Sequence, residues 1–112
     1  MHKGGRFMVK KHAEVIVNDY IKALKKKNLR IEKAILFGSY AKGNAGKDSD
    51  IDIAIISPDF GRDYVEEAIM LKEISEDINL DISPRPYSSE EYQNVKRGDF
   101  LYDEILVKGK HF

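Results

Sequence analysis

The stretch KAILFGSYAKGNAGKDSDIDIAIIS, residues 33–57, contains two apolar runs joined by a polar, glycine-rich segment. The first run, KAILF, is short and unbroken, which is typical of a buried strand and not of an amphipathic element. The second, DIDIAIIS, alternates aspartate with isoleucine before it becomes wholly apolar, and Pro58 follows it. The stretch therefore predicts two strands with a polar connection between them.

Helical patterns flank these two strands. Apolar residues recur at three- and four-residue steps over residues 9–27 and again over residues 62–78, which predicts an amphipathic helix in each range. In the second helix we expect the following side chains to face inward: Val65, Ala68, Ile69, Leu71, Ile74 and Ile78.

The C-terminal part continues the alternation of helices and strands. A third strand, INLDIS at residues 78–83, is expected to end at the PRP that follows it. Ser88 and Glu91 have the spacing of a capping box that opens a short helix, and DFLYDEIL at residues 99–106 predicts another. The order of elements predicts an α/β (α+β) fold built on a small sheet.

Length and composition limit the possible classes of protein. With 112 residues, of which 42% are hydrophobic, we expect a single domain over residues 9–112, preceded by a disordered lead-in over residues 1–8. Lys and Arg together number 19, as do Asp and Glu, so we expect no binding to long nucleic acid or to a membrane. Without cysteines, an apolar run of membrane-spanning length or a signal peptide, the expected location is cytoplasmic.

The polar segment nearly matches two known loops. Residues 41–47 match a P-loop, but Asp48 stands where a Ser or Thr hydroxyl must reach magnesium, and a strand follows where a long helix is required. Asp48, Asp50 and Asp52 have the spacing of three EF-hand ligands, but Ile53 stands at the position that must be glycine. Neither loop fits the sequence.

A different division of roles fits better. Residues two apart in a strand point to the same side, so Asp50 and Asp52 present two carboxylates together while Ile51 and Ile53 face the core. Two neighbouring carboxylates repel each other unless a cation lies between them. Magnesium binds hard oxygen ligands and often takes one or two carboxylates plus substrate phosphates. The pair therefore predicts a magnesium site that uses a nucleoside triphosphate.

Residues at the start of the segment are candidates for contact with the phosphates. Ser39 offers a hydroxyl and a backbone N–H at a strand end, especially if a short helix begins there. Gly38 lets a phosphate approach because it has no Cβ. Lys42 or Lys47 would add positive charge, and the pattern does not choose between them.

A third acidic ligand is offered by Asp81, which stands between Leu80 and Ile82 inside an apolar run. The alternative is an edge-strand aspartate that faces water. The carboxylate pair upstream favours the metal-binding interpretation of Asp81, since a two-metal site normally needs a third acid from a neighbouring strand.

These residues resemble a known family. Gly38 and Ser39, ten residues, and then Asp50-x-Asp52 match the GS-x10-DxD motif of the DNA polymerase beta-like nucleotidyltransferases, and the chain is similar to their minimal nucleotidyltransferase (MNT) branch. The resemblance implies a small mixed sheet flanked by helices. It also implies that Ser39 contacts the triphosphate and that Asp50, Asp52 and Asp81 hold two Mg²⁺ ions. Lys42 stands where family members often have arginine.

The resemblance further implies an activity and a partner. The implied reaction is transfer of a nucleoside monophosphate, AMP from ATP or the equivalent from another NTP, to an acceptor hydroxyl. Because 112 residues leave no room for an acceptor-holding lobe, we expect another chain to hold the acceptor, in a homodimer or hetero-oligomer. MNT proteins are commonly paired with a helical HEPN toxin, which they modify as antitoxins. The alternative is a nucleotide-binding regulatory subunit without turnover.

Overall fold

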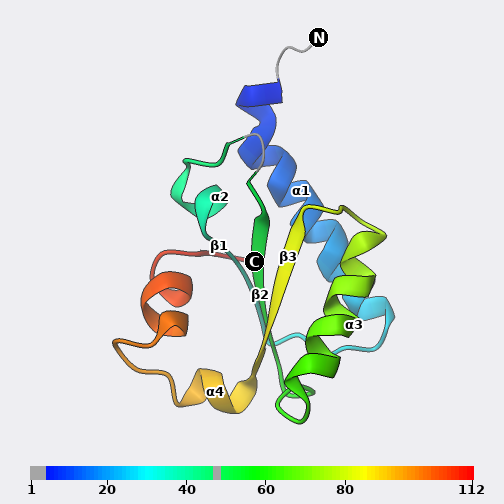
Figure 1. Cartoon of the computed structure of the whole chain (residues 1–112), viewed down its shortest axis with the longest axis vertical. Coiled ribbons are helices and arrows are strands. Elements are labelled where there is room, and N and C mark those ends of the chain that lie inside the picture. The colour runs from blue at the N-terminus through cyan, green and yellow to red at the C-terminus, as the bar shows by residue number, and fades with distance from the viewer. Residues whose placement is uncertain (1–4, 47–48) are drawn as a thin grey trace.

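A four-stranded mixed sheet forms the centre of the molecule in the computed structural model, which describes residues 5–46 and 49–112 (Figure 1). The strands are β1 (Lys33–Phe37), β2 (Ile51–Ser57), β3 (Ile82–Ser88) and β4 (Lys110–His111). Their order across the sheet is β3-β2-β1-β4. β1 pairs antiparallel with both β2 and β4, whereas β2 and β3 are parallel. This arrangement confirms the predicted α/β fold.

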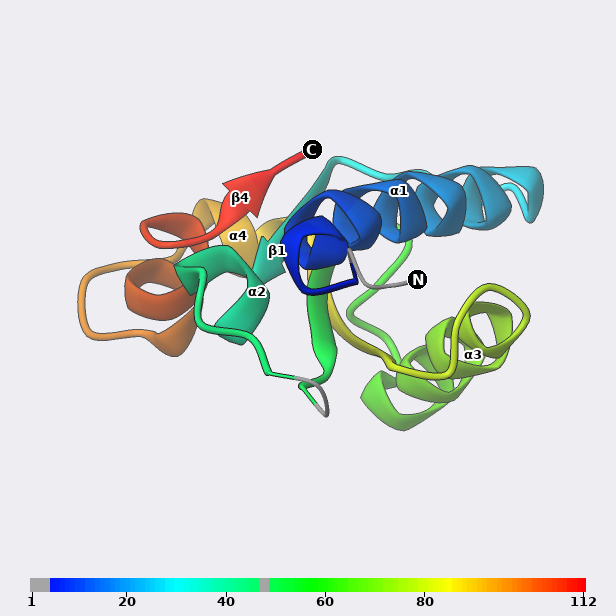
Figure 2. The ribbon, with the colours of Figure 1, turned by 90° about the horizontal axis from the view of Figure 1, so that it is seen from above.

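Helices cover both faces of this sheet. They are α1 (Gly5–Lys26), α2 (Ser39–Lys42), α3 (Tyr64–Glu76), α4 (Ser89–Gln93) and the π-helix η1 (Leu101–Leu106). Figure 2 shows α1 and α3 on one side of the strands, and α2, α4 and η1 on the other. None of the helices in the described part of the chain is long and apolar enough to cross a membrane.

The alternation of side chains along β2 divides the core into two clusters. Ile51, Ile53 and Ile55 pack in the cluster that contains residues of α1 and α3. Ala54 and Ile56 point the other way and pack with buried residues of η1. Full burial of one such aliphatic side chain contributes about 1.5–3 kcal/mol, so β2, buried on both faces, anchors the whole fold.

Helix α1 begins earlier than the sequence pattern predicts. It starts at Gly5, whereas the pattern predicts a start at residue 9. Adding a turn to a helix that already exists requires no new nucleation, which favours such an extension. Residues 1–4 lie outside the described residues.

A buried hydrogen bond connects α1 to α3. The hydroxyl of Tyr20 in α1 donates to the carbonyl of Leu71 in α3 at 2.8 Å.

The inward face of α3 is narrower than expected. Leu71 and Ser75 are buried, but Val65 and Ile69, which we expected to face inward, are 64% and 50% exposed. Ile69 precedes Leu71 by two positions, or ~200° around a helix of 3.6 residues per turn. The periodicity predicted the helix correctly, but it placed too many side chains of the helix in the core.

Strand β3 is shifted relative to the prediction. It runs from Ile82 to Ser88, through both prolines that were expected to end it, while residues 78–81 form a turn. The strand lies at the edge of the sheet, where proline is tolerated because only one side of the backbone pairs. The amide of Ile51 donates to the carbonyl of Asp81, and every second residue of β3 after Asp81 turns its backbone groups toward β2. The backbone groups of Pro84 and Pro86 therefore face away from β2.

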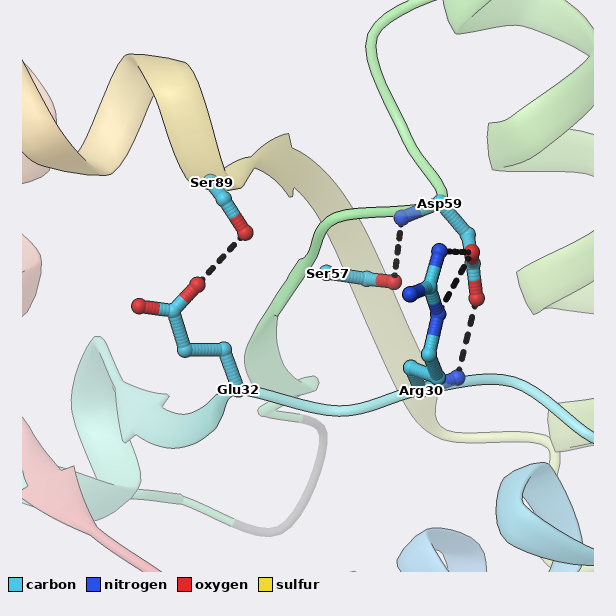
Figure 3. Close-up of polar contacts among 5 residues, drawn as sticks. All are labelled: Arg30, Glu32, Ser57, Asp59 and Ser89. Carbon is cyan, nitrogen blue, oxygen red and sulfur yellow. Dashed lines mark hydrogen bonds and ion pairs between the residues drawn. The ribbon is translucent and has the colours of Figure 1, made fainter.

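Polar contacts fasten the end of the sheet at which β2 finishes (Figure 3). The Arg30 guanidinium donates to Asp59 from Nε at 3.0 Å and from Nη2 at 2.6 Å, and the Arg30 amide donates to the other carboxylate oxygen at 3.0 Å. The Ser89 hydroxyl donates to Glu32. The capping box predicted at Ser88 is present and starts α4. This end of the sheet is held by contacts within the chain.

Candidate functional site

The opposite end of the sheet contains the glycine that follows β1. Gly38 has φ +74° and ψ −148°, a region of backbone conformation that essentially only glycine adopts. A Cβ added to Gly38 would clash with Oδ2 of the Asp52 carboxylate. The absence of a side chain at Gly38 therefore lets the Asp52 carboxylate lie directly against the backbone at the end of β1.

The two aspartates of the motif lie where the alternation predicts. Asp52 lies in β2 opposite Phe37 of β1, and Asp50 lies just before the strand. Ile51 and Ile53 are 2% and 0% exposed and face the core. Asp52 is half-buried and Asp50 is exposed, so both carboxylates lie outside the core that contains the isoleucines.

The electrostatics of this pair are unfavourable in the protein alone. Burial raises the pKa of Asp52, and the charge of Asp50 raises it further, while the charge of Arg85 acts in the opposite direction. A divalent cation would offset both the desolvation and the repulsion, and carboxylate oxygens are the ligands that Mg²⁺ prefers. The two carboxylates, one of them held against the backbone of Gly38, have the chemistry that such a cation requires.

Asp81 is not placed with this pair in a three-ligand cluster. It lies exposed in the turn before β3, and its amide donates to the Asn79 side chain at 2.8 Å. Its charge raises the pKa of Tyr40, after the larger effect of burial, so it lies near this tyrosine of α2. Within residues 5–46 and 49–112, no group of three His, Cys, Asp or Glu side chains is arranged to hold a metal ion.

Ser39 begins the short helix α2 directly after Gly38. Its carbonyl accepts hydrogen bonds from the amides of Gly43 and Asn44, which close the helix. The Lys42 amide donates to the Gly38 carbonyl at 3.1 Å. The backbone is thus fixed by its own hydrogen bonds, and the Ser39 side chain is half-buried.

Lys42, a candidate for phosphate binding, forms an ion pair with a residue of η1. Its ammonium lies 3.7 Å from the Glu104 carboxylate of η1, and Glu104 also pairs with Lys108 at 3.0 Å. Both lysines lower the pKa of Glu104, Lys108 more strongly through its hydrogen bond. Lys42 therefore links α2 to η1 in this structure. Lys47, its alternative, and Asp48 lie outside the described residues.

Arg85 is a charged residue near the site that the sequence did not indicate. It lies on β3 with its guanidinium 4.9 Å from the centre of the Phe100 ring and 5.8 Å from that of Phe37. Its charge reaches Asp52, where it lowers the pKa of that carboxyl against the larger effects of burial and Asp50. Extending the strand through the prolines would have placed Arg85 on the same face as Asp52, but the expected strand ended before it.

The sequence matches one family model and one curated relative. The model, described as "Nucleotidyltransferase domain", matches residues 17–109. The relative, named "Putative protein adenylyltransferase MJ0604", comes from Methanocaldococcus jannaschii and is 49% identical over 53 residues. The match covers 46% of this chain and 52% of that protein, so the chain spans about half the length of the relative.

Three solved structures have a similar fold. One is described as "a putative nucleotidyltransferase from Sulfolobus solfataricus", with a TM-score of 0.69, 18% identity and coverage of 100% of this chain and 90% of the other. A MntA–HpeT toxin–antitoxin mutant, with two aspartates two positions apart changed to glutamate, has a TM-score of 0.59 and 23% identity. A toxin–antitoxin structure with AMP-PNP has a TM-score of 0.55 and 26% identity. Each of the last two matches covers 85% of this chain and 70% of the other.

Proposed function

Because the chain belongs to the nucleotidyltransferase domain family, we propose that it catalyses the magnesium-dependent transfer of a nucleoside monophosphate, AMP from ATP, to a hydroxyl of a partner protein. The observation that carries this proposal is the carboxylate pair, with Asp52 held against the backbone of Gly38 and repelled by Asp50. The name of the Methanocaldococcus relative supports a protein acceptor, and the similar structure with AMP-PNP supports an adenine nucleotide.

In this proposal each side chain has a separate role. Asp50 and Asp52 hold the metal, and Asp81 supplies a further carboxylate from the turn before β3. Bound Mg²⁺ would neutralise charge on the phosphate oxygens and lower the pKa of the acceptor hydroxyl. Gly38, which has no Cβ, lets the Asp52 carboxylate lie against the backbone, and the Ser39 hydroxyl donates a hydrogen bond to the phosphates.

The proposed reaction is an in-line displacement. The acceptor oxygen attacks the α-phosphorus, the bond from that phosphorus to the bridging oxygen breaks, and pyrophosphate leaves with the electron pair. Asp81, exposed at the edge of the site, accepts the proton of the acceptor hydroxyl. The products are the adenylylated partner and pyrophosphate.

For the partner we propose a helical HEPN-type toxin, with this chain as the antitoxin. Two structures with this fold are toxin–antitoxin proteins, which supports the pairing. In such a pair the toxin presents its own hydroxyl to the site of the nucleotidyltransferase, as a hetero-oligomer. A homodimer that builds the acceptor site from two copies is the other assembly that the proposal allows.

The test is incubation of the full chain with α-³²P-labelled ATP, Mg²⁺ and a candidate HEPN-type partner. Label on the partner is expected with the wild-type chain and not with the double variant Asp50→Ala, Asp52→Ala. Asp59→Asn, at the other end of β2, is the matched control and should retain activity because its contacts are with Arg30. Nucleotide binding without release of pyrophosphate with any acceptor would instead favour the regulatory subunit.

A further inference from the structure

Arg85 is a cation at the candidate site that forms no ion pair with the described residues. Resting on the proposed function, we propose that the Arg85 guanidinium binds the phosphate chain of the nucleoside triphosphate. The role then belongs to a residue of β3, and Lys42 of α2 has a structural role. The position of Arg85, the rings that support it and its unused hydrogen-bond donors all favour this assignment.

The strand register places Arg85 on the face of the sheet that carries Asp52. In the parallel pair, Asp52 lies opposite Ser83, and Arg85 lies opposite Ala54. Paired residues of neighbouring strands point to the same side, and so do residues two apart in one strand. Arg85 is therefore one strand away from Asp52 and two residues farther along, a step of about 7 Å at the usual rise of a strand.

Two aromatic rings support the guanidinium. Phe37 and Phe100 pack edge to face with their centroids 6.0 Å apart, and Arg85 lies within cation–π distance of both. Phe37 is buried at the end of β1, one residue before Gly38, which fixes this support relative to the site. A guanidinium in cation–π contact with a ring keeps N–H donors that can bind a ligand.

Those N–H groups are almost unused. An arginine side chain has five N–H donors, and the Arg85 side chain makes one long hydrogen bond to the described residues, 3.5 Å from Nη1 to the Tyr87 hydroxyl. Of the ion pairs in the described part of the chain, none includes Arg85, whereas Lys42 pairs with Glu104. Lys42, the cation that the sequence suggested, is therefore already paired, whereas Arg85 has N–H donors that no described residue uses.

A polyphosphate is the ligand that matches this arrangement. Its oxygens can coordinate a metal held by Asp50 and Asp52 while other oxygens accept paired hydrogen bonds from a planar guanidinium. A lysine would supply a point charge without that geometry. The competing explanation is that Arg85 only balances the charge of Asp52, in which case it would not contact the nucleotide.

Calorimetric titrations with ATP, AMP and adenosine separate the two explanations. They should be made on the full chain, first in EDTA and then with Mg²⁺, for wild type, Arg85→Gln and Arg85→Lys. Arg62→Gln is the matched control, since Arg62 is an exposed arginine before α3. Because Arg85→Gln removes charge-assisted hydrogen bonds, we expect ATP to bind about tenfold more weakly or worse. AMP should lose less, adenosine should be unaffected, and Arg85→Lys should fall between wild type and Arg85→Gln.

A second variant tests the support. Phe100→Leu removes the ring 4.9 Å from the guanidinium, on a residue that is 48% exposed and can change with little effect on the core. It should weaken ATP binding by a smaller factor than Arg85→Gln and leave adenosine binding unchanged.

The outcomes distinguish this inference from the proposed function. Unchanged ATP affinity in Arg85→Gln, or equal losses for ATP and adenosine, would overturn the role of Arg85 while wild-type transfer still stands. If wild type binds no nucleotide under either condition, the proposed function fails and this inference fails with it. A lowered melting temperature with an unchanged ratio of ATP to adenosine affinity would make Arg85 structural and would also overturn the inference.

Discussion

Asp52 and Asp59 lie near the two ends of β2, and their surroundings act on them in opposite directions. The pKa of Asp59 is lowered, first by the hydrogen bond from the Arg30 side chain and then by that from the Arg30 backbone. The pKa of Asp52 is raised by burial and by the charge of Asp50. One end of the strand supplies a partner for its carboxylate, whereas the other end brings a second carboxylate beside the first.

The difference supports a structural role for Asp59 and the proposed ligand-binding role for Asp52. At the Asp59 end, the chain completes its own contacts: Asp59 pairs with Arg30 and Ser57 (Figure 3), and the Ser88 cap pairs with Glu91. At the Asp52 end, the chain accepts unfavourable electrostatics that a bound cation would relieve. Carboxyl groups with a raised pKa in a partly open site are typical of functional sites, and the opposite directions of the two shifts favour Asp52 over Asp59 for the proposed role.

The largest expected effect comes from Asp52→Asn. We expect the rate of nucleotidyl transfer to fall about a hundredfold to a thousandfold, the range seen when one group that stabilises transition-state charge is lost. The free energy of unfolding at pH 7 without metal should stay the same or rise, because a carboxyl with a raised pKa destabilises the folded state when charged. Urea denaturation and the label-transfer assay measure the two effects. Loss of stability together with activity would contradict the comparison.

Gly38→Ala should have the next largest effect, on both stability and metal binding. The backbone conformation of Gly38 would cost an alanine about 1–3 kcal/mol. The new Cβ would also displace the Asp52 carboxylate, whose Oδ2 lies where the methyl group would stand, and should weaken Mn²⁺ binding measured by calorimetry. Gly43→Ala is the matched control, since Gly43 also has a positive φ, +79°, but a Cβ added there would meet nothing in the described chain within 4 Å. Equal losses of Mn²⁺ affinity in both variants would argue against the contact.

Ser88→Ala affects the self-contained end of the sheet and should change stability alone. Its side chain accepts from the Glu91 amide at 3.0 Å while the Glu91 carboxylate accepts from the Ser88 amide at 2.8 Å. Loss of such an N-cap costs about 1 kcal/mol, which thermal or urea denaturation would detect. ATP and Mn²⁺ affinities should equal those of wild type. A change in either affinity would show that the two ends of the sheet are coupled.

The smallest effect is a difference in pH dependence between the two aspartates in metal-free buffer. Asp59 has a lowered folded pKa, so its stabilisation is present above the ordinary value of 3.8 and is lost as the pH falls through the folded pKa. Asp52 has a raised folded pKa, so its destabilisation is present at higher pH and disappears as the pH falls toward 3.8. Urea denaturation at a series of pH values should show that Asp59→Asn removes the first dependence and Asp52→Asn the second. If both variants changed the pH dependence of the free energy of unfolding in the same direction, the opposite pKa shifts assigned to Asp52 and Asp59 would be wrong.

The sequence correctly predicted the parts of the fold that depend on a local pattern, such as the alternation of side chains along a strand or the cap of a helix. The alternation of DIDIAII predicted which side of β2 carries Asp52 and which side carries Ile51 and Ile53, and the structure agrees. The capping box at Ser88 was likewise predicted from two residues. In both cases the determining contacts are local, so the sequence contains them.

The features that the sequence did not predict depend on position within the sheet and on partners distant in sequence. The prolines of β3 end a central strand but not an edge strand, and only the sheet order identifies β3 as an edge. Arg85 and its two rings come from three separate segments of the chain. The pairing of Lys42 with Glu104 of η1 joins segments equally far apart. The roles of all the candidate site residues remain predictions: Gly38, Ser39, Lys42, Asp50, Asp52 and Asp81.

The two prolines of β3 also limit how the protein can assemble. An exposed edge strand normally offers a row of amide donors to a strand of another molecule, which is a common route to aggregation. Pro84 and Pro86 occupy the outward-facing backbone positions of β3 and have no N–H to donate. Another chain therefore cannot extend the sheet by regular pairing along this edge, and the sheet stops growing at β3.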